Sequence, residues 1–204
     1  MEPKERILKG VEELFFRHGI KSITMDDIAK HLGMSKKTIY LSFADKDEVI
    51  HSLMQAKLKE DEREFREVCE QSANFVEEVF GHMKKIGAII GAANPNLFYD
   101  LQKFHPISWK LFREFKENCI CRMLEESLEK GKKQGLIRPD VHVRIMARLR
   151  MEEIEMGFNA ALFPPDKFKI VDVQLALIEH FLYGICTLKG HKLINKHKEV
   201  IEEE

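Results

Sequence analysis

Apolar residues recur at helical spacing along most of this chain, and that spacing limits the possible folds more than any other feature. Residues 4–18, for example, place Ile7, Val11 and Leu14 three or four positions apart, which puts them on one face of a helix. Only 11 Gly and 6 Pro interrupt the 204 residues, and no alternating run favours a strand. We therefore predict an all-α protein of about nine helices.

The second and third of these helices have clear end signals. Thr24 occupies the N-cap position of the second helix, and Asp27 follows three residues later, as a capping box requires. Gly33 supplies the left-handed residue that ends this helix. Ser35 caps a third helix that extends to about Ser42. Two short helices joined by a tight turn are therefore expected.

The segment from Met25 to Phe43 has the features of a helix-turn-helix. The side chains expected to form its small core are Ile28, Leu32, Met34 and Ile39. The side chains left on the outer face of its second helix are Lys36, Lys37, Tyr40 and Leu41. In the major groove, lysines donate to guanine acceptors and apolar groups contact the thymine methyl. Spacing alone also fits an ordinary helical hairpin with a solvated pair of lysines.

The order and spacing of residues around this segment closely resemble the TetR/AcrR family of transcriptional regulators. The matching residues are Phe15, Phe16, His18, Gly19, Thr24–Ala29, Gly33, Ser35, Lys36, Thr38, Tyr40, Phe43 and Lys46. The resemblance implies an N-terminal three-helix DNA-binding head and a larger C-terminal helical body that binds an effector and dimerises. We expect the head over residues 1–48, the body over 49–190 and a charged tail over 191–204.

The resemblance also implies roles for single residues in the head. Phosphate contacts are implied for Thr24, Tyr40 and Lys46, and positions at or near base edges for the residues that open the third helix. The complete set of expected DNA-binding residues is Thr24, Ser35, Lys36, Lys37, Thr38, Tyr40, Leu41 and Lys46. A dimer would read a near-palindromic operator. We expect a repressor that a small effector releases from DNA.

Beyond Glu48, only helical periodicity guides prediction. The candidate ligand-binding residues are mostly apolar or aromatic side chains of the expected middle helices. They are Phe75, Phe98, Tyr99, Phe104, Trp109, Phe112, Phe115, Cys119, Met123, Met151, Ile154, Phe158 and Asn159. Such stripes also suit a plain core. If they line a pocket, its Phe and Met content favours an apolar effector.

The helix expected over residues 167–189 is apolar on more than one side, whereas a surface helix needs only one apolar stripe. The surplus predicts a surface that pairs with a second copy of the chain. The expected dimer residues are Leu175, Ile178, Phe181, Leu182, Ile185 and Leu188. Together with the helix expected over residues 140–162, they would form a four-helix arrangement across a two-fold axis.

The sequence offers no signature of catalysis, metal binding or a membrane span. HExxH, P-loop and GxGxxG patterns are absent, and the four cysteines form no CxxC pair. The longest apolar stretch, residues 173–188, is too short to cross a bilayer. We expect a cytoplasmic protein that is not an enzyme and has no cofactor or metal. The alternatives are an activator, a regulator without a small ligand, and a helical protein-interaction module.

Overall fold

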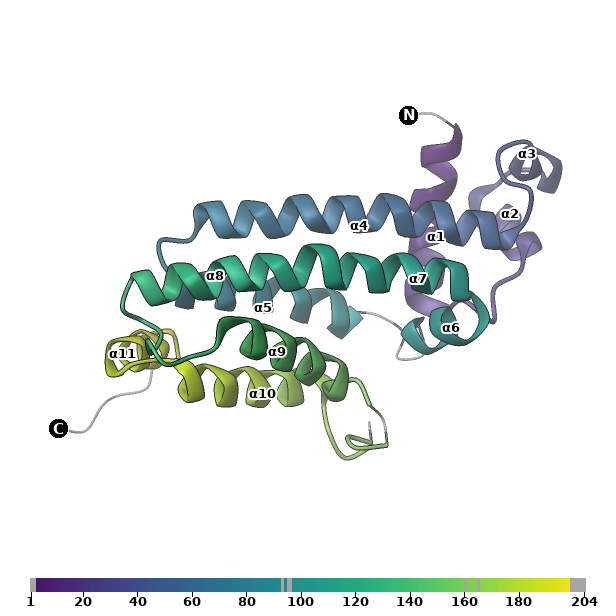
Figure 1. Cartoon of the computed structure of the whole chain (residues 1–204). Helices are drawn as coiled ribbons and strands as arrows, with labels where there is room; N and C mark the ends of the chain where they lie inside the picture. The colour runs from purple at the N-terminus through teal and green to yellow at the C-terminus, as the bar shows by residue number, and fades with distance from the viewer. Residues whose placement is uncertain (1–2, 93, 95–96, 160, 165, 199–204) are drawn as a thin grey trace. The chain divides into compact units, whose positions relative to one another are not determined.

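A computed structural model describes residues 3–92, 94, 97–159, 161–164 and 166–198, apart from the side chains of residues 86–92 and 98. Eleven α-helices and one short π-helix make up the regular structure of this part of the chain, and no strand forms in it (Figure 1). The predicted all-α class is confirmed.

The chain separates into two compact units. Unit 1 consists of Met1–Glu62 and Ala92–Phe115, and unit 2 consists of Arg63–Gly91 and Lys116–Glu204. The long helix α4 (Lys46–Gln71) therefore contributes residues to both units.

Unit 1 contains the predicted head together with two later helices. Besides the first part of α4, its helices are α1 (Pro3–His18), α2 (Met25–Leu32), α3 (Lys36–Tyr40), α6 (Leu97–Phe104) and α7 (Pro106–Phe115). Its core includes Ile7, Ile28 and Ile39, which are all fully buried. The buried carboxylate of Asp100 in α6 accepts a hydrogen bond from the Lys21 backbone N–H at 2.8 Å, so α6 is tied to the α1–α2 connection.

Unit 2 is a second helical core. Its helices, besides the last part of α4, are α5 (Phe75–Ala92), η1 (Lys116–Ile120), α8 (Cys121–Lys133), α9 (Val143–Gly157), α10 (Ile170–Ile185) and α11 (Leu188–His197). Helix α9 packs against both α8 and α10 (Figure 1). Phe75, Leu128 and Leu182 are fully buried at the centre of this core. None of the helices described is both long and apolar enough to cross a membrane.

The chain after α10 differs from the prediction of one helix to about residue 189 followed by a charged tail. Helix α10 ends at Ile185, and the Thr187 side chain accepts a hydrogen bond from the Gly190 N–H at 3.3 Å, which starts α11. A Cβ atom at Gly190 would lie only 2.5 Å from the Leu136 carbonyl oxygen. Glycine therefore permits close packing, and Ile194 is fully buried. Because most residues of this segment are charged or polar, the apolar face of its helix was not recognised in the sequence.

Candidate DNA-binding surface and internal pocket

Helix α2 is fixed at both ends by the residues that the sequence singled out. Thr24 Oγ1 accepts a hydrogen bond from the Asp27 N–H at 3.2 Å, and the Asp27 carboxylate accepts one from the Thr24 N–H at 2.9 Å, so the capping box is confirmed. Gly33 adopts a φ of 62°, a left-handed conformation that costs free energy for residues with a Cβ atom. These caps fix the direction in which α3 leaves the turn.

Helix α3 covers a buried residue and turns its remaining side chains outward. Ser35 Oγ accepts a hydrogen bond from the Thr38 N–H at 3.1 Å, and Ile39 is fully buried. Lys37, Tyr40 and Leu41 are exposed, with Leu41 at 81%. Two large apolar side chains therefore face solvent beside a lysine. All the expected DNA-contacting residues except Lys46 are exposed.

The ammonium groups of Lys36 and Lys46 have partners within unit 1. Lys36 Nζ lies 2.9 Å from Asp26 Oδ2, and this hydrogen bond raises the pKa of Lys36. Lys46 is half-buried and donates to the Ile20 carbonyl at 2.6 Å, and burial lowers its pKa. Lys46 thus ties the start of α4 to the α1–α2 connection, a structural role that the sequence did not indicate.

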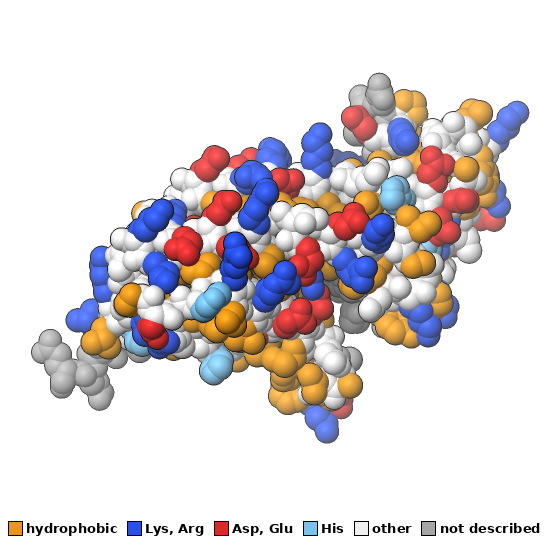
Figure 2. All heavy atoms as spheres, in the orientation of Figure 1, with side chains coloured by type: hydrophobic (Ala, Val, Ile, Leu, Met, Phe, Trp, Pro, Cys, Tyr) orange, Lys and Arg blue, Asp and Glu red, His pale blue; other side chains and the backbone are white. Residues whose placement is uncertain are grey.

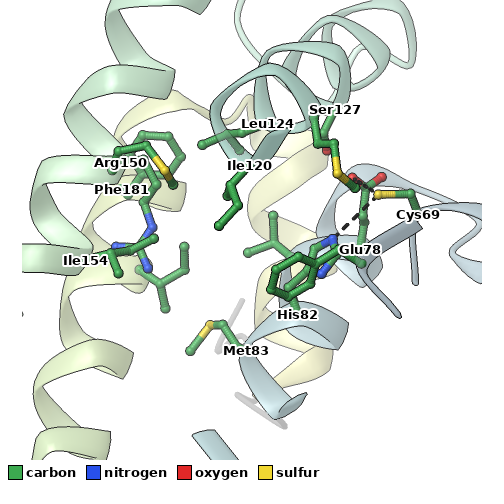
Figure 3. A pocket seen from close by; sticks show the side chains of 15 residues that line it. Cys69, Glu78, His82, Met83, Ile120, Leu124, Ser127, Arg150, Ile154 and Phe181 are labelled. Atoms are coloured by element: carbon green, nitrogen blue, oxygen red, sulfur yellow. Dashed lines mark hydrogen bonds between the residues drawn. The ribbon is translucent and has the colours of Figure 1, made fainter. Parts of the chain in front are cut away.

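Unit 2 contains a largely apolar pocket of about 100 Å³ (Figure 3). That is several times the roughly 10–15 Å³ that one water molecule requires. Its lining comes from α4, α5, η1, α8, α9 and α10. The lining residues are Phe65, Cys69, Glu78, Val79, His82, Met83, Ile120, Met123, Leu124, Ser127, Arg150, Met151, Ile154, Ile178 and Phe181.

One side of this pocket is polar. The Cys69 thiol donates to Glu78 Oε1 at 3.3 Å, and Cys69 Sγ lies 3.6 Å from His82 Nε2 (Figure 3). Glu78 is only 3% exposed, and Lys130 Nζ lies 3.5 Å from its Oε2. Burial and the Glu78 charge raise the pKa of Cys69 to about 12. Burial lowers the pKa of His82, which favours the neutral imidazole.

Arg150 lies across the cavity from this polar side (Figure 3). Its guanidinium donates to the buried Glu153 carboxylate at 3.3 Å and lies 6.0 Å from the centre of the Phe181 ring. Desolvation lowers the pKa of Arg150. The pocket therefore places a buried ion pair at one edge of an apolar cavity.

Three predicted ligand-binding residues line this pocket: Met123, Met151 and Ile154. Other predicted members of unit 2 lie outside the lining. Phe75 is fully buried in the core, and Cys119 Sγ lies 3.7 Å from Met123 Sδ. Phe158 and Asn159 follow the end of α9, where the Asn159 side chain accepts a hydrogen bond from the Ala161 N–H.

The other predicted ligand-binding residues belong to unit 1. Trp109 stacks on Phe112 with 5.1 Å between the ring centres, whereas Tyr99 and Phe104 are exposed. Phe115 is the last residue of α7, and the Phe98 side chain lies outside the described residues. Sequence reasoning missed the lining residues from α4 and α5. The four-residue spacing of Glu78 and His82, which places both on one helix face, was the available signal.

The predicted dimer residues divide into two groups. Ile178, Phe181, Leu182 and Ile185 are buried within unit 2, whereas Leu175 and Leu188 are exposed. Figure 2 shows hydrophobic side chains gathered over α9, α10 and the segment between them. The exposed apolar residues of this surface, named here the α9–α10 patch, are Ile145, Leu149, Met156, Leu162, Phe168, Val171 and Leu175.

Residues 7–53 match the family model described as "Bacterial regulatory proteins, tetR family". Over 146 residues, covering 69% of this chain and 75% of the relative, the sequence is 29% identical to the HTH-type transcriptional regulator YvaF of Bacillus subtilis (strain 168). Two solved structures have a similar fold. The Bacillus subtilis regulator FadR in complex with stearoyl-CoA matches with a TM-score of 0.64 and 19% identity, over 89% of this chain and 98% of that one. A Saccharomonospora viridis transcriptional regulator in complex with choline matches with a TM-score of 0.72 and 18% identity, over 90% and 97%.

Proposed function

The chain belongs to the TetR/AcrR family of transcriptional regulators, and from this premise we propose that α3 reads the major groove of an operator. The observation that carries the proposal is the outer face of α3, where Lys37, Tyr40 and Leu41 are exposed above a fully buried Ile39. The Thr24 and Gly33 caps hold this face in a fixed orientation. Fixed donors beside an apolar contact suit direct readout of base edges.

The proposed roles differ among the expected DNA-binding residues. Lys37 and Leu41 face base edges, and the Tyr40 hydroxyl contacts phosphate. Lys36 must exchange its Asp26 partner for DNA. The hydroxyl of Thr24 and the ammonium of Lys46 already have partners within the head. We therefore propose that these two residues stabilise the DNA-binding surface and add little direct contact with DNA. The proposed head remains residues 1–48, and the effector-binding and dimerising body residues 49–190.

We propose the unit 2 pocket as the effector site, and a mainly apolar small molecule as the effector. Ten of its fifteen lining side chains are Phe, Ile, Leu, Val or Met, which favours apolar ligands. Helix α4 contributes Phe65 and Cys69 to the lining, and its first turn follows the helix-turn-helix. A molecule bound in the pocket would therefore contact α4 and could shift the helix that continues into the head. We propose repression relieved by this effector, in the cytoplasm, with no catalytic role.

A gel-shift experiment with DNA flanking the chain's own coding region tests the proposed function. We expect a discrete complex at low salt that competitor DNA of unrelated sequence does not displace, because base contacts add to phosphate contacts. A second arm adds compounds that raise the melting temperature in a thermal-shift screen. Those compounds should be largely apolar and should release the DNA. Failure to bind any duplex refutes the DNA-binding role, whereas binding that ignores every stabilising compound refutes only the effector role.

We further propose that the α9–α10 patch pairs two copies of the chain across a two-fold axis. The double variant Leu149→Arg, Leu175→Arg should be monomeric at micromolar concentration, because two buried charges would face their symmetry copies. Light scattering should then give the 23.9 kDa mass of one chain instead of twice that value. The matched control is Ile107→Arg, which changes an exposed apolar residue of unit 1 and should leave the dimer intact. A monomeric wild-type protein would contradict the proposal.

A further inference from the structure

The polar side of the unit 2 pocket brings together three side chains of the types that bind transition metals. Cys69 comes from α4, while Glu78 and His82 lie one turn apart on α5. One potential ligand atom from each residue lies within 4.8 Å of the other two. Figure 3 shows the three side chains converging at one edge of the cavity. We propose that Cys69, Glu78 and His82 form a binding site for a divalent metal ion of the Zn²⁺ class.

Two of the three separations between ligand atoms are close to those of a tetrahedral site, and the third lies within 4.8 Å. With Zn–S near 2.3 Å and Zn–N or Zn–O near 2.1 Å, tetrahedral geometry separates the sulfur from each other ligand by about 3.6 Å. Cys69 Sγ lies 3.6 Å from His82 Nε2 and 3.3 Å from Glu78 Oε1. The Glu78 carboxylate needs a shift of a few tenths of an ångström to admit the ion.

The donor set selects the class of ion. One thiolate, one imidazole and one carboxylate form a mixed set that suits borderline-soft Zn²⁺ and excludes Mg²⁺ and Ca²⁺, which prefer oxygen ligands. On binding, the Cys69 thiol releases its proton to solvent as the sulfur–metal bond forms, and no redox change is involved. The Cys69 thiolate and the Glu78 carboxylate then bring two negative charges to the ion, while the Lys130 ammonium lies 3.5 Å from Glu78 Oε2 and adds a further positive charge. The fourth position faces the cavity, where water or a pocket ligand can occupy it.

One buried polar atom in the pocket lining supports the proposal. Ser127 Oγ has no hydrogen-bond partner among the described residues. Buried polar atoms in native proteins are nearly always satisfied, and exceptions mark places that a water or an ion completes. A metal-bound water in the cavity would offer a partner that the apolar lining cannot. The proposal stands independently of DNA binding.

Cobalt substitution in the purified full chain tests the site. After chelator treatment under reducing conditions, one equivalent of Co²⁺ should produce thiolate-to-cobalt charge-transfer absorption in the near ultraviolet, and Zn²⁺ should abolish it. Cys69→Ser should remove this absorption and weaken Zn²⁺ binding at least about 100-fold in a chelator competition, since even outer partners of metal ligands contribute 10–100-fold. Cys119→Ala is the control, because it removes another buried thiol outside the cluster.

His82→Asn gives a second and distinct readout. This variant should bind metal more weakly but keep the charge-transfer absorption, because the thiolate remains. If Cys69→Ser does not fold, His82→Asn alone tests whether the cluster binds metal. Circular dichroism of the metal-free variants checks folding. Absence of the absorption in the wild-type chain overturns the site and leaves a cysteine–glutamate hydrogen bond as the role of the cluster. Absorption lost in Cys119→Ala but kept in Cys69→Ser also overturns it.

Discussion

A chain carrying Lys37→Ala and Tyr40→Ala is expected to bind its operator at least about 30-fold more weakly than the wild-type chain. Each good base or phosphate contact is worth about 1–3 kcal/mol, and two such losses amount to about 2–6 kcal/mol. We expect Lys37 to contribute more to operator affinity than its neighbour Lys36. Lys36 must first give up its hydrogen bond to Asp26, whereas the structure gives Lys37 no ion pair among the described residues.

Sequence preference separates the two substitutions. Removing a base contact relaxes the preference for the operator, whereas removing the uncharged Tyr40 hydroxyl from a phosphate weakens binding about equally on every sequence. We therefore expect Lys37→Ala to reduce the difference in affinity between the operator and a scrambled duplex, as measured by fluorescence anisotropy. Lys110→Ala is the control, because this lysine of α7 is also exposed and its Nζ lies 3.7 Å from Glu114 Oε1. If the double variant kept wild-type affinity and wild-type sequence preference, α3 would not be part of the DNA interface.

Leu128→Ala is expected to lower the free energy of unfolding by about 2–5 kcal/mol, the range for leucine truncations in cores. Leu128 is fully buried in unit 2. One turn later, a Cβ atom at Gly131 would lie 2.6 Å from Ile137 Cδ1. Because α8 is already pressed against this neighbour, the surroundings have little room to close over the lost side chain. The cost should therefore lie in the upper part of the range.

The matched control is Leu41→Ala, the same substitution at an exposed site, which should change stability by less than about 0.5 kcal/mol. Urea unfolding followed by circular dichroism measures both variants at one protein concentration, because a dimer's stability depends on concentration. Equal stabilities of the two variants would show that Leu128 is not in a close-packed core.

The head was predictable because its signals are local. The Thr24 capping box and the Gly33 turn lie within ten residues of each other, and each specifies a backbone conformation without reference to the rest of the chain. The partner of Lys46 was not predictable in this way. The Ile20 carbonyl lies 26 residues earlier, so the contact exists only once α1 and α4 have packed.

The body was less predictable because periodicity identifies apolar faces but not what covers them. Ile178 and Phe181 have the pattern of a partner surface, yet they are buried within unit 2 beside the pocket. The same ambiguity placed Trp109 and Phe112 among the pocket candidates, although they belong to unit 1. Only the tertiary arrangement decides which helix faces meet. The cluster of Cys69, Glu78 and His82 likewise depends on α4 and α5 lying together.

The buried Ser127 hydroxyl in the pocket lining, whose Oγ has no hydrogen-bond partner among the described residues, has a consequence for how the pocket would discriminate among similar molecules. A lining of Ile, Leu, Met and Phe distinguishes chain lengths weakly, by about 10–200-fold for each methylene group. A buried donor or acceptor that an occupant leaves unmatched is far more costly, with discrimination on the order of 10⁴-fold. Two molecules of equal carbon number would thus be sorted by the chemistry of a single functional group at one end.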